Sequence, residues 1–379
     1  MKKELRSGLR TWIEIDTKSI AHNYRVFRSM IPKQCKYLSV VKSNAYGHGL
    51  VDFAREAEKL GADYLGVDSV VEGLTLRREG IKLPILVLGY TLPEMVEEAA
   101  LHDITISVSH FESLLALSKR KGDKKISVHI KVDTGMHRQG FFFEDRERLM
   151  KELKKLSAVL SVDGLYTHFA AAKNPAFPAY TVGQIDEFKQ WITEFKKVGF
   201  SPIVHASATA GTILFPQAHF DMVRIGIGQH GVWPAREVRA WAEDKFTLKP
   251  TLTWKAIISE VKVIPAGGKI GYDLTETVTK DTKVGVCPIG YWHGFPRALS
   301  AIGKVTIGGC TAKVLGRVSM DMIVLDVSNV EKVKVGDEVT LIDSKLGSGI
   351  SADDMAGLAD GSVYEILTRV NPLIKRFYI

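Results

Sequence analysis

Short β-branched runs alternate with amphipathic stretches from residue 37 to about residue 230. This alternation is typical of parallel strands that are joined by crossover helices. The predicted strands occupy residues 37–42, 64–68, 84–88, 104–108, 127–132, 164–168, 203–206 and 222–226. Helices are predicted between them, for example over 92–102 and 181–199, where apolar residues of the second stretch recur at i, i+3, i+4 and i+7.

Eight strands with a helix between successive strands match a (β/α)8 barrel. An open doubly wound sheet is the alternative, although such a sheet usually has fewer strands. We therefore expect an α/β chain with an N-terminal TIM-like barrel, the (β/α)8 architecture, over residues 1–243.

A second domain is expected because 379 residues exceed what one hydrophobic core usually organises. Beyond about residue 243 the helical period ends, and alternating runs follow at 251–264, 284–289, 301–307, 311–315, 322–327 and 338–343. These runs predict a mostly β C-terminal domain over residues 244–379. The early run Trp12–Asp16 also has a strand pattern, and because the barrel already has its strands we expect residues 1–16 to pair with the β domain.

Composition narrows the class of protein. With 45% hydrophobic and 25% charged residues, the chain is expected to be folded and soluble. The net charge of +8 is modest, and the basic runs at 119–125 and 154–155 lack interleaved aromatic residues. These runs favour solvated helix ends over a nucleic-acid surface.

The cysteines and the N-terminal sequence indicate the cellular compartment in which the protein is expected. Cys35, Cys287 and Cys310 stand far apart, which favours neither a zinc site nor a disulfide framework. The basic start is not followed by an apolar core, and no run approaches about 18 apolar residues. We therefore expect a cytoplasmic protein with no membrane partner.

Polar residues gather at the ends of the predicted barrel strands, where barrels build their active sites. These residues are Lys42, Lys131, Asp133, Arg138, His168, Ser207 and Arg224. A lysine at the end of an apolar strand is unusual, because burying an ammonium group is costly unless it is paired or loses its proton. A neutral lysine amine forms Schiff bases with aldehydes. The alternative is a lysine whose side chain simply reaches water.

The loops after the last two predicted strands are common phosphate sites in barrels. Ser207 and Gly226–Gly228 occupy these positions. A plain tight turn at Gly226–Gly228 is the alternative. Together with a lysine at a strand end, the pattern favours a phosphorylated aldehyde as the ligand.

The segment Val40–Gly49 (VVKSNAYGHG) resembles the signature around the cofactor-binding lysine of the alanine racemase family. Further blocks resemble the family in the same order, at 128–138, 167–169, 223–226, 271–272, 290–291, 316–321 and 364–365. The resemblance covers both predicted domains. It implies a pyridoxal 5′-phosphate (PLP)-dependent isomerase that interconverts L- and D-alanine and supplies D-alanine for peptidoglycan.

The resemblance also implies two catalytic bases. Lys42 would bind the cofactor aldehyde and act as the base on the D-alanine face, and Tyr272 would act on the L-alanine face. Two bases are needed because a planar carbanion must lose its proton on one side and regain it on the other. A phenol ordinarily loses its proton near pH ~10, and the family supplies His168 and Arg224 as its neighbours. Arg224 also resembles the arginine that faces the cofactor ring nitrogen.

Binding roles follow from the same resemblance. The phosphate would be held by Tyr46, Ser207, Gly226, Ile227 and Tyr364. Arg138 would bind the cofactor's phenolic oxygen and the substrate carboxylate, and the backbone N–H of Met320 would also bind that carboxylate. Lys131 matches a lysine that is carbamylated in many relatives, where the resulting anion orients the arginine.

The resemblance implies a homodimer. Tyr272, Met320 and Asp321 would reach into the partner subunit's barrel, with Tyr291 at the entrance. The chain departs from the family pattern without losing a catalytic group. The departures are Asp273 for a glycine, His293 for an aspartate, Gln229-His230 for Leu-Tyr, Ile225 for a proline, Ala206 for an asparagine, and Lys173 near a usual aspartate.

Three alternatives remain at this point. A racemase of the same fold could act on serine or on a broader set of amino acids. A non-catalytic PLP-binding barrel would share the lysine, but that group lacks a second domain. A metal-dependent hydrolase would use His48, His168 and His205 as ligands, but no two of these histidines lie on one strand.

Overall fold

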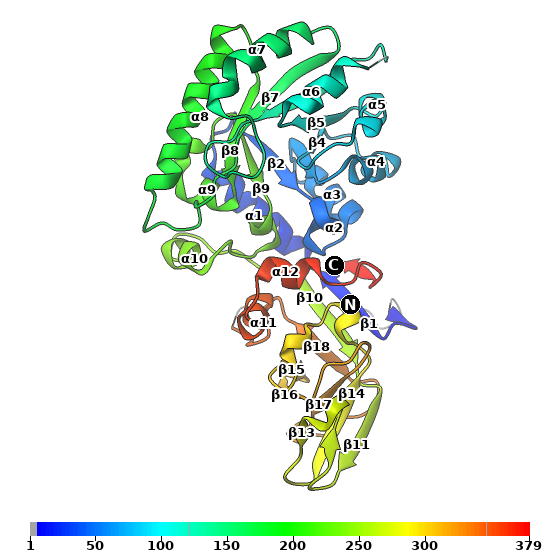
Figure 1. Ribbon diagram of the computed structural model, residues 1–379. Coiled ribbons are helices and arrows are strands. Elements are labelled where there is room, and N and C mark those ends of the chain that lie inside the picture. The colour runs from blue at the N-terminus through cyan, green and yellow to red at the C-terminus, as the bar shows by residue number, and fades with distance from the viewer. Residues whose placement is uncertain (1–5, 121, 346) are drawn as a thin grey trace. The chain divides into compact units, whose positions relative to one another are not determined.

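The fold is described from a computed structural model, which describes residues 6–120, 122–345 and 347–379 (Figure 1). The chain divides into two compact units. The larger unit comprises Ala21–Ala45 and Leu50–Leu248. The smaller unit comprises Lys249–Ile379, Tyr46–Gly49 and the described part of Met1–Ile20. The segment Tyr46–Gly49 therefore belongs with the C-terminal residues, although it directly follows Ala45 of the larger unit in the chain.

The larger unit is a closed barrel of eight parallel strands, which confirms the predicted fold class. Each predicted run overlaps one strand. The strands are β2 (Lys36–Val40), β3 (Tyr64–Val67), β4 (Ile85–Val87), β5 (Ile104–Val108), β6 (Ile126–Lys131), β7 (Leu160–Tyr166), β8 (Ile203–Ala208) and β9 (Met222–Ile225). Pairing between β2 and β9 closes the barrel. Leu65, Ile85, Val128 and Val223 are fully buried, as expected for strands covered on both faces.

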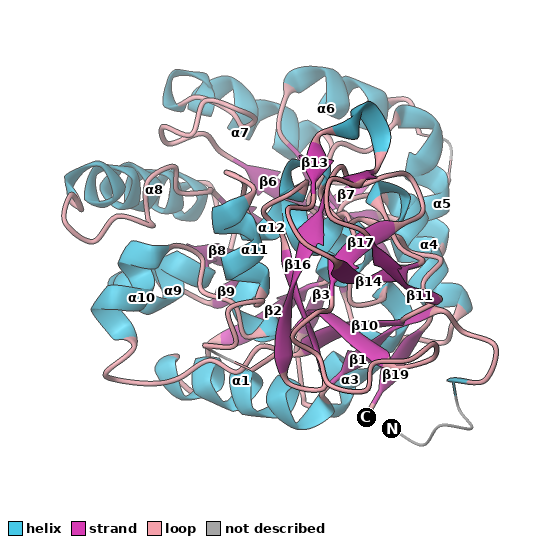
Figure 2. Cartoon of the chain, turned by 90° about the horizontal axis from the view of Figure 1, so that it is seen from below, coloured by secondary structure: helices cyan, strands magenta, loops and turns pink. Residues whose placement is uncertain are grey.

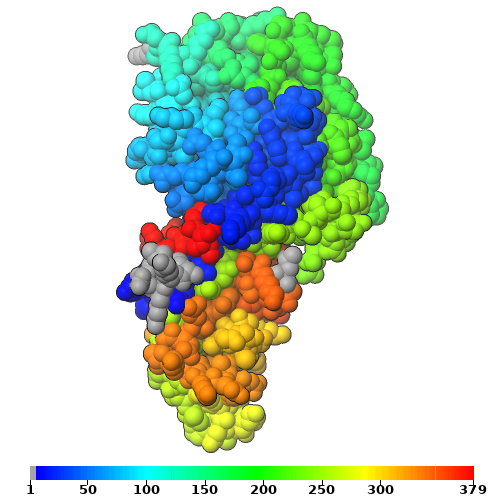
Figure 3. Space-filling model, turned by 180° about the vertical axis from the view of Figure 1, so that it is seen from behind, coloured from blue at the N-terminus to red at the C-terminus, as the bar shows by residue number. Residues whose placement is uncertain are grey.

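Helices surround the barrel strands (Figures 1 and 2). They are α1 (Thr17–Met30), α3 (Leu50–Lys59), α4 (Val70–Arg78), α5 (Val96–Leu101), α6 (Phe111–Ser118), α7 (Arg146–Lys155), α8 (Ala179–Lys197), α9 (Thr209–Leu214) and α10 (Arg236–Ala242). In α8 the buried face is formed by Ile185, Phe188, Trp191 and Phe195, which is the spacing that the sequence predicted. The space-filling view shows the side chains of α1 and α3, in blue, covering one side of the barrel (Figure 3).

The smaller unit is built on a nine-stranded sheet in the order β11-β14-β17-β16-β15-β18-β10-β1-β19. The strands are β1 (Thr11–Ile15), β10 (Leu252–Ile257), β11 (Glu260–Ile264), β14 (Thr282–Cys287), β15 (Lys304–Ile307), β16 (Cys310–Leu315), β17 (Ile323–Asp326), β18 (Glu338–Ile342) and β19 (Arg376–Tyr378). A short hairpin of β12 (Lys269–Ile270) and β13 (Glu276–Thr277) forms a second sheet.

The early strand β1 lies inside this C-terminal sheet. It pairs antiparallel with β10, where Ile13 faces Trp254, and parallel with β19. Of the segment 1–16, residues 1–5 lie outside the described part of the chain. Alternation in β10 buries Leu252, Trp254 and Ala256 against the core of the unit. The pairing follows because the barrel has no open edge that β1 could join.

Two helices of the smaller unit were not predicted, α11 (Ala352–Leu358) and α12 (Val363–Thr368). They span seven and six residues, too few for an apolar period to be recognised. Their N-caps carry the stronger signal, because Ser351 and Asp354 form a reciprocal capping box and Ser362 accepts from the N–H of Tyr364.

Candidate active site

Lys42 lies at the carboxyl end of β2 and begins a left-handed turn, labelled α2 (Lys42–Tyr46). Ser43, Asn44, Ala45 and Tyr46 all have φ between 48° and 57°. A run of L-residues in this conformation is costly and must be held by other contacts. The Asn44 side-chain oxygen accepts from the N–H of Leu50 at 3.0 Å, and the Ala45 N–H donates to the carbonyl of Val41 at 2.8 Å.

Two carboxylates hold this turn, and the sequence did not point to either of them. Glu72, in the first turn of α4, accepts from the backbone N–H of Ser43 at 2.8 Å and from that of Asp68 at 2.7 Å. Asp68 follows β3 directly, and its carboxylate accepts from Lys42 Nζ at 2.9 Å. The Lys42 amine is therefore held by an anion on the neighbouring strand.

Arg224, on β9, is buried with only 3% of its surface exposed. Its guanidinium donates to the carbonyls of Thr167 and Ala206 at 2.9 and 2.7 Å, and to Nδ1 of His205 and of His168 at 2.8 and 3.2 Å. Burial lowers the pKa of Arg224 from 12.5 to about 10, which still leaves it charged at neutral pH. Within the described ranges none of the groups that accept from Arg224 is a carboxylate, so its positive charge is not paired there.

The guanidinium also fixes the tautomers of the adjoining histidines. Arginine can only donate, so Nδ1 of both His168 and His205 must accept and the proton of each ring lies on Nε2. Nε2 of His205 therefore donates to Nδ1 of His129 at 2.9 Å. Burial, followed by the charge of Arg224, lowers the pKa of His168 to about 3. His168 is thus a neutral ring with its N–H on the side away from Arg224.

Lys131 ends β6 and is 5% exposed. Burial, and then the charges of Arg138 and Arg224, lower the pKa of Lys131 to about 8. Its ammonium group donates to the side-chain carbonyl of Gln139 at 3.3 Å and lies 5.7 Å from the ring centre of Tyr166. The structure therefore brings Lys131 and Arg138 into one electrostatic cluster with Arg224.

Ser207 and Gly226–Gly228 lie at the carboxyl ends of β8 and β9, as the sequence predicted for a phosphate site. The Ser207 hydroxyl donates to the carbonyl of Ala218 at 2.8 Å. Thr209 Oγ1 accepts from the N–H groups of Gly226 and Gly228 at 3.3 and 3.4 Å. A Cβ at Gly228 would lie 2.4 Å from the Phe27 ring, so this turn leaves no space for a side chain there.

In the smaller unit, two further predicted phosphate ligands lie together. The rings of Tyr46 and Tyr364 are 6.2 Å apart at their centres. Burial raises the pKa of Tyr46 to about 12, and burial also raises the pKa of Tyr364. Both phenols are therefore neutral hydrogen-bonding groups at neutral pH.

Tyr272 lies in the turn between β12 and β13 and is 71% exposed. The next residue, Asp273, has φ 58°, the left-handed conformation that favours glycine. Its carboxylate lies 2.9 Å from Nε of Arg317. The turn that presents Tyr272 is thus attached to the residue pair Gly316-Arg317 after β16.

Tyr291, Met320 and Asp321 form a second group in the smaller unit. The N–H of Tyr291 donates to the carbonyl of Ser319 at 3.0 Å, and Tyr291 and Met320 are 44% and 54% exposed. Asp321 lies 3.9 Å from Nδ1 of His293, which also accepts from the N–H of Gly290 at 3.2 Å. Tyr272 and Lys42 lie in different units of the chain.

Some other departures and nearby side chains have structural roles. Gln229 accepts from the Ser39 hydroxyl at 2.7 Å and donates to the carbonyl of Val40 at 2.9 Å, which ties the end of β2 to the loop after β9. Nε2 of His48 lies 2.8 Å from the Thr251 hydroxyl in the smaller unit, and His205 packs at 4.8 Å on Tyr166.

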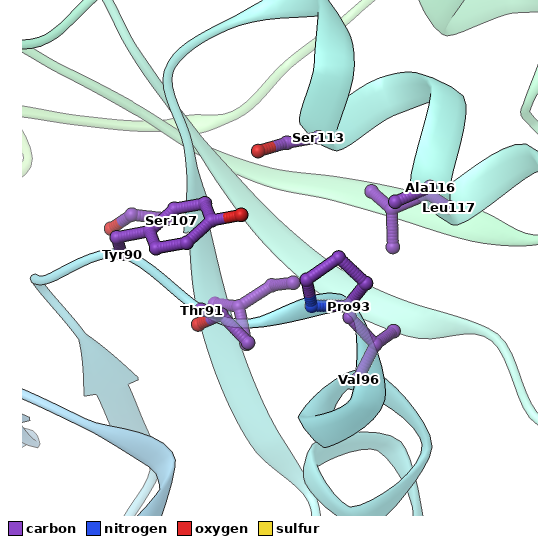
Figure 4. A pocket seen from close by; sticks show the side chains of 9 residues that line it. Tyr90, Thr91, Pro93, Val96, Ser107, Ser113, Ala116 and Leu117 are labelled. Carbon is purple, nitrogen blue, oxygen red and sulfur yellow. The ribbon is translucent and has the colours of Figure 1, made fainter.

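A small hollow of about 10 Å³ lies beside β5 and α6, room for about one water (Figure 4). Thr91 and Ser107 are among its lining residues, and the Thr91 hydroxyl has no partner within the described part of the chain. Ser107 is 2.7 Å from the Tyr166 hydroxyl. None of the predicted site residues lines this hollow.

Among the described residues, no group of three His, Cys, Asp or Glu side chains is placed to hold a metal ion. Among the same residues, no helix combines the length and the apolar character needed to cross a bilayer.

Comparison with known proteins covers nearly the whole chain. Residues 15–234 match the family model of the alanine racemase N-terminal domain, and residues 251–378 match that of the alanine racemase C-terminal domain. The chain belongs to the alanine racemase family.

Alanine racemases from several bacteria are similar over their full length. The alanine racemase of Symbiobacterium thermophilum is 41% identical over 98% of both chains, and that of Carboxydothermus hydrogenoformans is 37% identical over 97% of this chain and 99% of its own. The crystal structure of the Bacillus anthracis alanine racemase with bound L-Ala-P has a TM-score of 0.91 at 32% identity, covering 98% of this chain and 95% of that one. The Clostridium difficile 630 alanine racemase has a TM-score of 0.91 at 33% identity, covering 98% and 96%.

Proposed function

We propose that this chain is an alanine racemase that uses PLP to interconvert L- and D-alanine, supplying D-alanine for peptidoglycan. The observation that carries the proposal is that the Lys42 amine and the buried Arg224 guanidinium lie at the carboxyl end of one barrel, and that among the described residues Arg224 donates to no carboxylate. The full-length similarity to alanine racemases supports the same activity. Three free thiols, Cys35, Cys287 and Cys310, support a reducing compartment such as the cytoplasm.

The donor set fits PLP. The cofactor needs an amine for its aldehyde, donors for its phosphate and a group facing its ring nitrogen. Lys42 supplies the amine, and Arg224 is the group for the ring nitrogen. Ser207, Gly226, Ile227 and the two neutral phenols of Tyr46 and Tyr364 are the donors for the phosphate. When bound, PLP supplies an electron-withdrawing system that stabilises negative charge on the substrate α-carbon.

Arg224 limits that stabilisation. Its pKa of about 10 keeps it charged, so Arg224 would offer the ring nitrogen of a bound cofactor a hydrogen bond while keeping its own proton. An arginine that keeps its proton would leave that nitrogen unprotonated, which would favour return of a proton to the substrate α-carbon over transamination.

Proton movement belongs to Lys42 and Tyr272. Lys42 removes or returns the α-proton on the D-alanine face, and Tyr272 does so on the L-alanine face. Nε2–H of His168 is the donor that would stabilise the Tyr272 phenolate, since Nδ1 of that ring is engaged by Arg224. Arg138 and the Met320 N–H would hold the substrate carboxylate.

A homodimer completes the site in this proposal. Tyr272, Met320 and Asp321 would act in the partner subunit's barrel, and Tyr291 would line the entrance. The exposed Tyr272, Tyr291, Trp292 and Met320 side chains of the smaller unit support such an interface.

The experiment is a pair of substitutions followed by exchange of the α-hydrogen into heavy water. Lys42→Ala is expected to abolish racemisation in both directions, because it removes the cofactor anchor and one base. Tyr272→Phe is expected to remove exchange from L-alanine far more than from D-alanine. Retained racemisation in Lys42→Ala, or equal losses from both enantiomers in Tyr272→Phe, would refute the assignment.

A further inference from the structure

Asp68 is a charged residue at the barrel mouth to which the proposed reaction has so far given no role. It follows β3, and β3 lies beside β2 in parallel register, with Leu38 opposite Tyr64 and Val40 opposite Gly66. Continuing the same offset by two residues places Lys42 opposite Asp68. The two side chains are therefore neighbours because of the sheet register, which does not depend on any one side-chain rotamer.

The backbone on both sides of this pair is tied by one side chain. Glu72 accepts from the N–H of Ser43 through one carboxylate oxygen and from the N–H of Asp68 through the other. Glu72 is itself set at the start of α4, where Ser69 caps its backbone N–H. Glu72 thus fixes the backbone next to both residues of the 2.9 Å contact between Lys42 Nζ and the Asp68 carboxylate.

Positive charges near Lys42 make the Asp68 carboxylate important for stabilising the ammonium form of Lys42. The charge of Lys42 acts on Lys131 and His168 at other strand ends, and the cations Arg138 and Arg224 act on the same two groups. The Asp133 carboxylate accepts hydrogen bonds from the backbone N–H groups of Gly135 and His137. Glu72 is likewise engaged by backbone. Asp68 is the carboxylate, among the described residues, that contacts the Lys42 amine.

We infer that Asp68 is a positioning residue for the Lys42 base, whose carboxylate orients the amine and stabilises its ammonium form when it takes the α-proton from the D-alanine face. The inference rests on the proposed racemase function. In the D-to-L direction the proton moves from the α-carbon to Lys42 Nζ while Tyr272 gives a proton to the opposite face, and in the L-to-D direction both transfers reverse. Asp68 keeps its negative charge throughout.

The first test uses the full-length chain without cofactor. Amine labelling of Lys42 by acetic anhydride, measured by mass spectrometry at a series of pH values, reports where the amine loses its proton. In Asp68→Asn the labelling midpoint is expected to fall by roughly 0.5–1 pH unit at low salt, because the anion that stabilises the ammonium form is gone. Asp68→Glu keeps the negative charge, so its labelling midpoint is expected to stay close to that of the wild-type chain.

The second test uses the loaded enzyme. Asp68→Asn is expected to slow α-hydrogen exchange from D-alanine about twofold to threefold more than exchange from L-alanine, because Lys42 is the proposed base on the D-alanine face alone. Glu79→Gln is the matched control, since it breaks an exposed ion pair of 2.8 Å with Arg55 on the outside of the barrel. It is expected to leave both measurements unchanged.

The outcomes separate the two claims. An unshifted midpoint, or equal slowing from both enantiomers in Asp68→Asn, would overturn the role of Asp68 while the wild-type chain still racemises alanine. A wild-type chain that binds PLP but does not racemise alanine would overturn both the proposed function and this role of Asp68. A shifted midpoint together with the unequal slowing would support the inference.

Discussion

At the scale of single residues, the buried guanidinium of Arg224 has no carboxylate acceptor among the described residues. Arg224 donates to four acceptors, none of them an anion, and the histidines that meet it are held neutral. A buried ring beside a fixed cation is costly to protonate, because the second positive charge is both desolvated and repelled. The free energy of unfolding is therefore expected to fall in acid.

Three buried histidines predict how stability depends on pH. Burial lowers the pKa of His129 to about 4, that of His168 to about 3, and that of His205 well below 6.5. The unfolded chain takes up these protons below about pH 6.5 and the folded chain does not, so the stability is complete above 6.5 and is lost as the pH falls toward 4. Urea unfolding of the cofactor-free chain should show a loss of roughly 1.4 kcal/mol per pH unit for each histidine.

A free energy of unfolding that stays constant between pH 6.5 and 5 would contradict the assignment of neutral buried rings.

Some residues of the candidate site could be predicted from the sequence and others could not. Lys42, Lys131, His168 and Arg224 were predictable because strand ends in a barrel face one mouth. Asp68 and Glu72 were not, because their contacts depend on the register between β2 and β3 and on the start of α4. The register between two strands cannot be predicted from the spacing of residues along the chain.

At the scale of elements, β-branched runs located all eight barrel strands, since strands buried on both faces have continuous apolar sequences. The turn after β2 could not be predicted. Of its four residues with positive φ, only Asn44 belongs to a type that tolerates this conformation. It is held by contacts from elsewhere in the fold, including Glu72.

Gly47, which follows this turn, gives a matched test of how closely the element is packed. Gly47 and Gly80 have nearly the same φ, 86° and 84°. A Cβ at Gly47 would lie 2.1 Å from the carbonyl oxygen of Leu367, whereas nothing lies within 4 Å of a Cβ at Gly80. Gly80→Ala should lower the free energy of unfolding by about 1 kcal/mol through φ alone, and Gly47→Ala by roughly 3 kcal/mol or more.

Gly47→Ala should also weaken PLP binding, since the displaced carbonyl belongs to α12, the helix of Tyr364. Thermal unfolding and a cofactor titration check both effects. Equal destabilisation by the two substitutions would show that Leu367 does not pack on Gly47.

At the scale of the whole molecule, the proposed site uses parts of two units, and neither unit holds both bases. Lys42 belongs to the barrel, while Tyr272 projects from a hairpin of the β unit with 71% of its surface exposed. The sequence located both blocks through their resemblance to the family. Periodicity alone could not have linked them, because the proposed contact between subunits would leave no spacing signal within one chain.

The most direct test mixes two inactive variants. Purified Lys42→Ala and Tyr272→Phe chains are unfolded or dissociated together, reassembled with PLP, and assayed for alanine racemisation by circular dichroism. If each site takes Lys42 from one subunit and Tyr272 from the other, random pairing makes half of the dimers mixed, each with one intact site. The mixture should then recover about a quarter of the wild-type activity. A mixture as inactive as its separate components would contradict an active site shared between subunits.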